Sequence, residues 1–338
     1  MTQLIVGVDV SQATLNLAVR TPDGVLEDLP VWANDPTQFP ALAQRLQQEL
    51  ARWAATTLQV VVEPTGGYEQ PWAQFAHQQG WTVSLPNPRQ VRDWARGKGY
   101  RAKTDPVDAR ILAEYGAACA PPAWQPLPPA VVQLEALLLR REDLRTMLRQ
   151  EQNRQHALQA QGISTGPVVD SLTQSSTALE QALRALDTAQ QQHLQQYPHL
   201  QQQADLLQQV PGIGTRNVWF ILVLLYRWST LTQNQGHYKG LTAYVGLDPT
   251  PYSSGRSVHR HATISRQGNP LLRQMLYLGA LGGVRGHSPL RTFYQRLVGR
   301  GKPKKLALVA AARKILVWAW AVFREQTPFD AQRAVAIA

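Results

Sequence analysis

Four carboxylates in the first third of this 338-residue chain stand where acids have little structural use. Asp9 lies inside the β-branched apolar run 4–11, which has the composition of a strand buried on both faces. Glu63 ends a second run of this kind. Asp105 and Asp108 stand three residues apart at the start of a predicted helix and therefore share one helix face. We expect these four acids to meet in one site.

Carboxylates that converge repel one another unless divalent cations neutralise them. An all-oxygen ligand set selects Mg²⁺ or Mn²⁺ over Zn²⁺. Two such ions, roughly 4 Å apart, clamp the attacking and leaving oxygens of a phosphodiester. Simpler alternatives stay open. An edge strand would turn Asp9 to water, and helix capping would explain one of the two acids at Asp105 and Asp108.

The elements that must position these acids are predicted to be an antiparallel meander followed by alternating helices and strands. This is the order of an α/β RNase H-like domain. The predicted strands are 4–11, 14–21, 25–32, 58–63 and 81–85, and the predicted helices are 37–55, 68–79 and 105–115. The stretch 89–103 is predicted to be a flexible basic loop that contacts phosphates. Its Gly97-Lys98-Gly99 is too short to be a nucleotide-binding P-loop.

The middle of the chain favours a helical hairpin. A proline-rich linker spans 121–129, and leucines at helical spacing then predict one helix to about 161 and a second over 169–196. A coiled coil between domains is the simplest interpretation of two long helices rich in Gln, Arg and Leu.

The C-terminal part opens with 206–215, which has the pattern of a helix–hairpin–helix turn that can bind phosphate; a plain glycine connector is the alternative. A loop rich in turn-forming, hydroxylic and basic residues is predicted over 246–261. Helices are predicted at 269–283, 288–298 and 304–323.

Charge is distributed unevenly along the chain. Residues 1–88 carry a net charge of −5, whereas residues 211–338 carry +15. A basic balance of this size is expected of a nucleic-acid-binding protein, although a merely basic soluble protein is the alternative. The single cysteine, Cys119, and the lack of an N-terminal signal pattern predict a cytoplasmic protein without disulfides. The apolar run 306–323 carries Arg313 and Lys314 at its centre, which favours a buried helix over a membrane span.

Short motifs along nearly the whole chain carry a resemblance to a known family. They are Gly7-Val8-Asp9, Glu63-Pro64-Thr65-Gly66, Asn87-Pro88, 103–110, Pro211-Gly212-Ile213-Gly214, Gly246-Leu247, Ser254-Gly255 and 264–273. In this order they resemble the DEDD transposases of the insertion-sequence group IS110, the bridge-RNA-guided recombinases. The resemblance implies a RuvC-like catalytic domain at 1–128, a coiled-coil hairpin at 129–200 and a transposase domain with a serine nucleophile at 201–338.

The same resemblance implies the roles of single residues. Asp9, Glu63, Asp105 and Asp108 match the metal-binding tetrad of the family, and Ser254 matches its nucleophile. Ser253 and Ser257 are rivals for that role. The resemblance also implies a covalent phosphoserine intermediate, two Mg²⁺ or Mn²⁺ ions and a homo-oligomer that combines the tetrad of one subunit with the serine of another. Its partners would be donor DNA, target DNA and a structured guide RNA, with no membrane.

Glycines and cations near these motifs are candidates for contacts with nucleic acid. They are Arg92, Arg96, Lys98, Arg101, Lys103, Gly212, Gly214, Lys239, Arg256, Arg260, Arg266 and Arg273. Three rival functions are considered. A RuvC-like nuclease or Holliday-junction resolvase would use water in place of the serine, a non-catalytic nucleic-acid-binding protein would tolerate loss of the tetrad, and a coiled-coil adaptor would need neither site.

Overall fold

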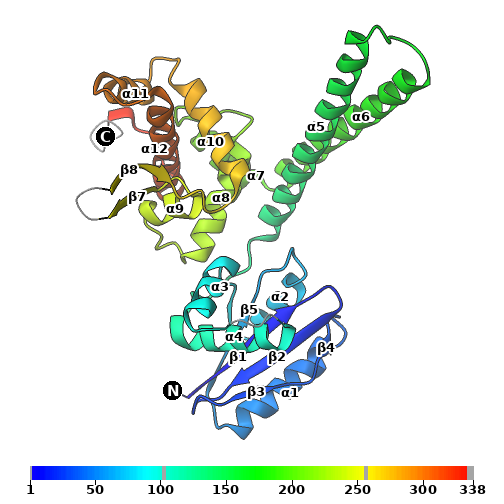
Figure 1. Cartoon of the computed structure of the whole chain (residues 1–338), viewed down its shortest axis with the longest axis vertical. Helices are drawn as coiled ribbons and strands as arrows, with labels where there is room; N and C mark the ends of the chain where they lie inside the picture. The colour runs from blue at the N-terminus through cyan, green and yellow to red at the C-terminus, as the bar shows by residue number, and fades with distance from the viewer. Residues whose placement is uncertain (1, 101–103, 255–257, 333–338) are drawn as a thin grey trace. The chain divides into compact units, whose positions relative to one another are not determined.

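The computed structural model describes residues 2–100, 104–254 and 258–332, with the backbone alone over 251–254 and 258–262 (Figure 1). The chain forms two compact units. The first comprises Met1–Pro126 together with Thr230–Thr232, and the second comprises the remaining residues. The predicted division into three domains stays a prediction, and each unit is described by itself.

The first unit is built on a mixed six-stranded sheet. Its strands are β1 (Gln3–Val10), β2 (Thr14–Arg20), β3 (Leu26–Asp28), β4 (Trp32–Ala33), β5 (Thr57–Val62) and β6 (Thr82–Ser84). The order is β3-β2-β1-β5-β6, with β4 also paired to β2. β1, β2 and β3 are antiparallel, whereas β5 and β6 continue parallel to β1. The predicted meander is confirmed, except that its third strand is split into β3 and β4 around Pro30, which has no N–H to donate to the sheet.

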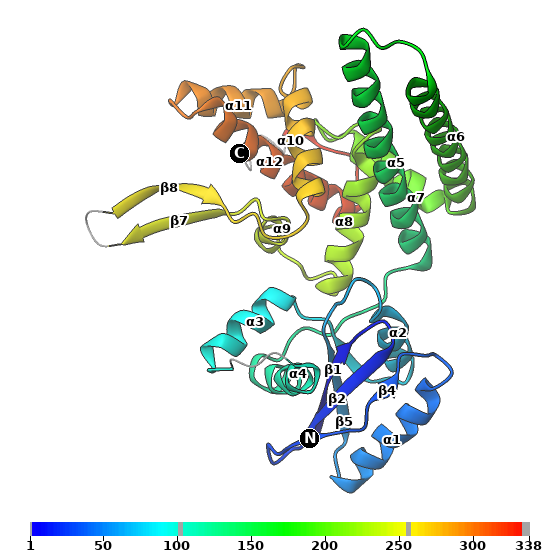
Figure 2. The ribbon, with the colours of Figure 1, turned by 45° about the vertical axis from the view of Figure 1, so that its right-hand side comes forward.

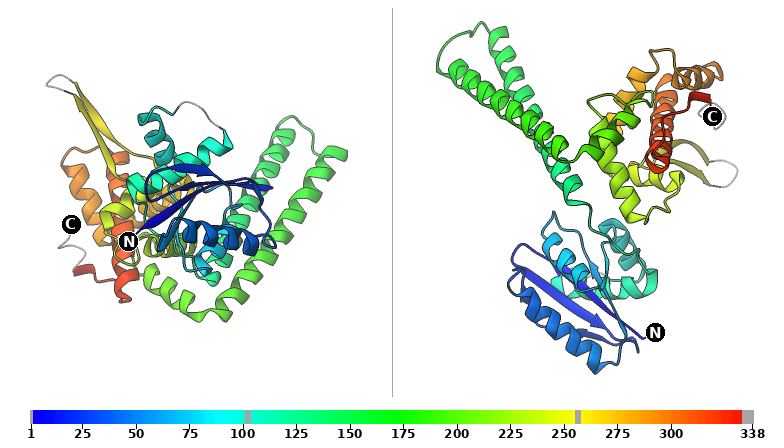
Figure 3. Two further views of the ribbon diagram at one scale, coloured as in Figure 1. Left: turned by 90° about the horizontal axis from the view of Figure 1, so that it is seen from below. Right: turned by 180° about the vertical axis from the view of Figure 1, so that it is seen from behind.

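Alternation along β1 sends its side chains to two different cores. Leu4, Val6, Val8 and Val10 lie in a cluster with side chains of α1 (Phe39–Arg52) and α2 (Gln70–Gln78). The other face of β1 packs against α4 (Asp105–Cys119), so helices cover both faces of the sheet (Figure 3). Asp9 belongs to the α4 face because it is an odd-numbered residue in this alternation.

Two glycines let α4 lie directly on the strands. A Cβ on Gly7 would lie 2.0 Å from the carbonyl oxygen of Ala109, and a Cβ on Gly116 would lie 2.7 Å from Val61 Cγ2. No larger residue fits at either point without a backbone shift. The helix extends beyond the predicted end at 115, to Cys119, where Ala120 terminates it in the left-handed conformation.

The expected loop at 89–103 is wrong in its first part, because residues Pro88–Gly97 form the helix α3. Asn87 caps this helix by accepting a hydrogen bond from the backbone N–H of Arg89, and Pro88 occupies its first position. Val91 and Ala95, one turn apart, are buried against the α4 core. Two buried residues and a good cap are enough to order a stretch whose composition is otherwise polar.

The second unit begins with two long helices, α5 (Pro129–Ala160) and α6 (Pro167–Gln196), which lie side by side (Figures 1 and 3). The predicted helical hairpin is confirmed, while its assignment as a coiled coil stays a prediction. Near its open end, a ring nitrogen of His193, Nε2, lies 2.8 Å from the carbonyl oxygen of Ala130 and is hydrogen-bonded to it.

Six further helices complete this unit. They are α7 (Pro198–Gln208), α8 (Val218–Leu231), α9 (Tyr238–Val245), α10 (Pro270–Gly283), α11 (Pro289–Gly299) and α12 (Lys304–Glu325). The predicted helices near 269, 288 and 304 are confirmed. Among the described residues α12 is long and apolar enough to cross a membrane, but most of that segment is buried by α7, α9, α10 and α11, as in the core helix of a globular unit.

The expected loop at 246–261 is also wrong, because it contains a β-hairpin made of β7 (Pro249–Ser254) and β8 (Val258–Ile264). The two strands pair antiparallel with an irregularity between Thr250 and Tyr252. This hairpin extends away from α9 as a two-stranded arm (Figure 2). Its two strands are joined by backbone pairing, which does not require the apolar composition of a buried strand.

Candidate active site

The four acids gather at one end of β1 because of how α4 crosses it. Gly116 contacts Ile5 and Ala109 contacts Gly7, so α4 runs antiparallel to β1. Asp105, one helical turn before Ala109, therefore lies beside the end of β1 that carries Asp9.

Glu63 reaches the same end through the parallel pairing of β5 with β1. The register sets Val62 beside Val8, and the backbone N–H of Glu63 donates a hydrogen bond of 3.3 Å to the carbonyl oxygen of Val8. Glu63 is the first residue after β5, and the same register continued by one residue sets it beside Asp9. In α/β sheets this carboxyl edge of parallel strands is the usual place for a binding site.

The pKa of Asp9 responds to the other three acids. Burial is the largest cause that raises this pKa, and the negative charges of Asp105, Asp108 and Glu63 add to it, so that together they bring it to about 6. A hydrogen bond from the Val10 backbone opposes the shift. This effect on Asp9 supports the prediction that it lies near the other three acids. An edge strand with Asp9 facing open water is excluded, since β1 lies between β2 and β5.

The donor set fits a hard divalent cation, since it offers only carboxylate oxygens and a field that a cation would relieve. In the arrangement described, no three acidic, histidine or cysteine side chains of the described residues lie close enough together to hold an ion. The ligand roles of Asp9, Glu63, Asp105 and Asp108 therefore stay a prediction.

A cation of the chain stands at the edge of this site. The Arg92 guanidinium on α3 lies 3.6 Å from the Glu63 carboxylate. Sequence reasoning predicted Arg92 to contact phosphate but missed its approach to Glu63, because it did not recognise α3; the signal was the capping pair Asn87-Pro88. Arg96 makes an exposed ion pair of 3.7 Å with Asp93 on the same helix.

The other three cations predicted to bind nucleic acid in the stretch 89–103 are Lys98, Arg101 and Lys103. Lys98 lies with its Nζ 5.8 Å from the centre of the Trp94 ring. Arg101 and Lys103 lie outside the described residues.

Ser254 is the last residue of β7 and pairs with Val258. Ser253 pairs with His259, so the two serines belong to opposite faces of the two-stranded arm. Arg260 pairs with Tyr252, two residues before Ser254 and on its face. Arg256 and Ser257 lie outside the described residues.

The base of the arm is built by close backbone contacts. A Cβ on Gly246 would lie 2.0 Å from the carbonyl oxygen of Gln267, and the Ser265 hydroxyl donates a hydrogen bond to Asp248. The Arg273 guanidinium donates to the carbonyl oxygens of Val245, Gln267 and Gly268 at 3.1, 2.8 and 3.0 Å. These bonds give Arg273 a structural role that sequence reasoning did not foresee. Its contact with nucleic acid stays a prediction, as do those of the exposed residues Lys239 and Arg266.

The predicted phosphate-binding turn around Gly212 and Gly214 is shaped by contacts within the unit. A Cβ on Gly212 would lie 2.9 Å from the carbonyl oxygen of Gly279 on α10. The N–H of Gly214 donates to Asn217 Oδ1 at 2.8 Å, and Asn217 Nδ2 donates to the carbonyl oxygen of Gly212 at 2.9 Å. Helix packing thus explains Gly212, and the phosphate role of the turn stays a prediction.

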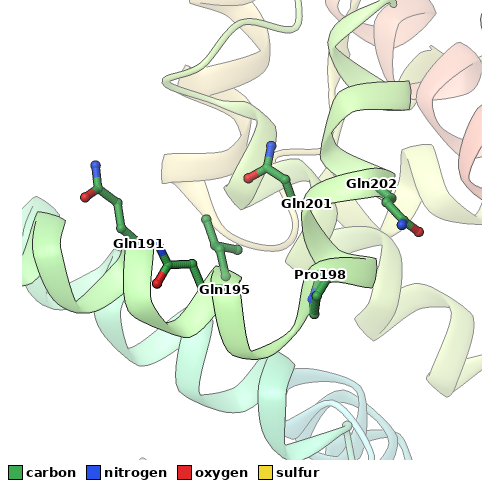
Figure 4. A pocket seen from close by; sticks show the side chains of 6 residues that line it. Gln191, Gln195, Pro198, Gln201 and Gln202 are labelled. Carbon is green, nitrogen blue, oxygen red and sulfur yellow. The ribbon is translucent and has the colours of Figure 1, made fainter.

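An open hollow lies at the junction of α6 and α7 (Figure 4). Its lining consists of Gln191, Leu194, Gln195, Pro198, Gln201 and Gln202. This lining offers neither a charge nor a nucleophile, so the acid cluster of the first unit is the better candidate for chemistry.

Comparisons with known proteins agree with the geometry. A family model described as Transposase matches residues 6–161, and one described as Transposase IS116/IS110/IS902 family matches residues 204–295. A pilin gene-inverting protein of Moraxella lacunata is 32% identical over 331 residues, which cover 98% of both chains. The chain belongs to the IS110 family of transposases.

Other members of the IS110 family and one solved structure are similar over shorter stretches. An uncharacterized protein of insertion element IS110 from Streptomyces coelicolor is 32% identical over 166 residues, which are 49% of this chain and 38% of that protein. The solved structure, T. thermophilus RuvC in complex with Holliday junction substrate, is 18% identical and covers 35% of this chain at a TM-score of 0.26.

Proposed function

We propose that this IS110 transposase cuts and rejoins DNA strands with Asp9, Glu63, Asp105 and Asp108 as a metal-binding tetrad and Ser254 as nucleophile. The observation that carries the tetrad is the raised pKa of Asp9, to which the three other acids contribute. The strand order and directions of the first unit support a RuvC-like, RNase H-like domain.

In the proposed reaction the Ser254 hydroxyl oxygen attacks a backbone phosphorus and displaces one DNA oxygen. The serine gives up its proton, the departing DNA oxygen takes one up, and a phosphoserine bond replaces the phosphodiester. Attack by the hydroxyl of a second strand reverses these bond changes and rejoins the DNA. Two Mg²⁺ or Mn²⁺ ions held by the tetrad would neutralise the charge that develops on the phosphate.

The tetrad belongs to the first unit and Ser254 to the second. We propose that the working site combines the tetrad of one subunit with the Ser254 arm of another, in a homo-oligomer. A two-stranded arm that extends away from its helices supports an approach to a second subunit (Figure 2).

The proposed partners are donor DNA, target DNA and a structured guide RNA, met in the cytoplasm. The net charge of +15 over residues 211–338 supports contact with nucleic acid. The guide RNA rests on the family resemblance.

The test is a trapped reaction analysed by mass spectrometry. Wild-type protein with Mg²⁺ and a nicked substrate should yield a DNA-linked peptide that contains phosphoserine at position 254. Ser254→Ala should bind DNA but form no adduct. Ser253→Ala is the matched control and should keep most activity, because its position lies on the opposite face of the arm.

Two outcomes would change the proposal. An adduct at Ser253 or Ser257 would move the nucleophile. Cleavage by Ser254→Ala with a free phosphate end would support a RuvC-like nuclease or Holliday-junction resolvase that uses water, which the tetrad alone could sustain.

A further inference from the structure

The turn that follows Glu63 is held by a buried carboxylate. Glu69 is 4% exposed, and its Oε2 accepts hydrogen bonds from the backbone N–H groups of Thr65 and Gly67 at 2.9 and 3.0 Å. Its Oε1 accepts a third from Gln70 Nε2 at 2.8 Å. A buried carboxylate is costly without such donors, so the turn and the carboxylate stabilise each other.

The charge state of Glu69 agrees with this arrangement. Burial raises the pKa of the carboxyl, but hydrogen bonds from Gln70, Thr65 and Gly67 lower it more, so the pKa lies below its ordinary value. Glu69 is therefore ionised at neutral pH and acts as an acceptor of hydrogen bonds and not as a proton donor.

Two more hydrogen bonds link this turn to the acid-bearing strand ends. The Thr65 hydroxyl donates to the carbonyl oxygen of Glu63 at 3.1 Å. Asn34 Nδ2 donates to the carbonyl oxygens of Ser11, two residues after Asp9, and of Tyr68, at 2.9 and 3.0 Å. The ends of β1 and β5 are thereby fixed to one another through the turn.

We propose that Glu69 is a positioning residue that fixes the turn at 64–68 so that Glu63 stays beside Asp9 and can share a divalent cation with it. This inference rests on the proposed metal tetrad and adds a residue that is neither a ligand nor in contact with substrate.

The variant that tests it is Glu69→Gln in the full chain. Glutamine keeps the size of the side chain but removes its charge, and its single oxygen cannot replace both carboxylate oxygens: an NH₂ group facing Thr65 and Gly67 meets two N–H donors, and one facing Gln70 requires that amide to turn. Loss of such an outer partner typically weakens metal affinity about tenfold or more. The matched control is Glu49→Gln, since Glu49 is 1% exposed, lies in the same unit and pairs with Arg45 and Arg52 on α1.

Two readouts separate positioning from stability. Isothermal titration with Mn²⁺ should show about tenfold weaker binding for Glu69→Gln and unchanged binding for Glu49→Gln, even though both variants melt at lower temperature. Hydrogen–deuterium exchange in the metal-free protein should show faster exchange over 65–67 in Glu69→Gln alone. Asn34→Ala, which keeps the carboxylate, should show a smaller change of the same kind.

The outcomes test the positioning role of Glu69 separately from the proposed metal tetrad. In one outcome, Glu69→Gln lowers the melting temperature but binds Mn²⁺ with wild-type affinity, while Glu63→Gln no longer binds Mn²⁺. Glu69 would then only stabilise the fold, and the proposed tetrad would stand. A wild-type protein that binds no Mn²⁺ would overturn the tetrad and this inference together.

Discussion

At the scale of single residues, the most informative side chain is Asp9. A carboxylate on a central strand could be tolerated simply by protonation, and its raised pKa of about 6 shows a tendency in that direction. Three neighbouring acids contribute to the raised pKa. An aspartate that only formed a turn at a strand end would not need other acids close to it. Asp9 therefore costs stability in the free protein, as expected of a residue kept for function.

Because a charged Asp9 lowers the stability of the metal-free protein, we expect that stability to depend on pH when a chelator is present. The folded pKa of Asp9, about 6, exceeds the unfolded value of about 3.9, so the folded state holds the proton more tightly between these values. The stability associated with Asp9 is then fully present below about pH 4 and is lost as the pH rises to about 6. Asp9→Asn should remove this loss.

The measurement is the melting temperature of Asp9→Asn minus that of wild type, across pH and with EDTA. The difference should become more positive between about pH 4 and pH 6 and then level off. A difference that stays flat across this range would mean that the pKa of Asp9 is not raised, either by burial or by the neighbouring acids.

At the scale of elements, the hydrophobic pattern was sufficient to predict β1, β2, β5 and the long helices, because each carries apolar residues at the regular spacing of its element. It was not sufficient for α3, whose order depends on the Asn87 cap and on Val91 and Ala95 amid charged residues. The β7–β8 arm was missed because a hairpin stabilised by strand pairing needs no apolar alternation.

For the candidate site too, some features could be predicted from the sequence and others could not. That Glu63, Asp105 and Asp108 lie near enough to influence Asp9 could be predicted from their placement at a strand end and on one helix face, while the ligand roles of the four acids stay a prediction. Arg92 and Asn34 could not, because their contacts cross 23 to 34 residues of sequence, and Arg92 also stands on a helix that the pattern did not reveal. The role of Glu69 could not be predicted either, because its contacts with Thr65 and Gly67 depend on the shape of the turn.

The contact between α4 and β1 predicts the effect of Gly7→Ala. Its Cβ would meet the backbone of Ala109 and Ala113 at 2.0 and 2.4 Å, so the helix must move away from the strand. We expect a loss of about 1–3 kcal/mol in unfolding free energy. Because Asp105 and Asp108 move with the helix, Mg²⁺-dependent cleavage should fall as well.

Urea denaturation and a cleavage assay check this prediction. Gly97→Ala is the matched control, since nothing lies within 4 Å of its Cβ, and it should change neither quantity by much. A Gly7→Ala protein with wild-type stability would show that α4 does not rest on β1 as described.

At the scale of the whole molecule, acid chemistry and basic charge are separated along the chain. The first unit carries the four acids proposed as a tetrad, whereas the strongest positive balance lies in residues 211–338. We expect the affinity for target DNA to fall steeply with salt, because cations that contact phosphates release counterions. We also expect sequence-specific binding to require the guide RNA.

Binding measured with and without RNA across a salt series checks both expectations. RNA-free protein that binds its target sequence with equal specificity would show that the protein reads bases directly. A flat salt dependence would contradict phosphate contacts by the basic region.

The most direct test of the account mixes two inactive subunits, Asp9→Asn and Ser254→Ala. Neither should cleave DNA alone. A mixed oligomer holds one site in which the intact tetrad of the Ser254→Ala subunit meets the intact Ser254 of the Asp9→Asn subunit. We expect the mixture, assembled with RNA, DNA and Mg²⁺, to recover cleavage with a DNA adduct on the Asp9→Asn chain. Cleavage by Ser254→Ala alone, or no cleavage by mixed oligomers that assemble on DNA, would contradict it.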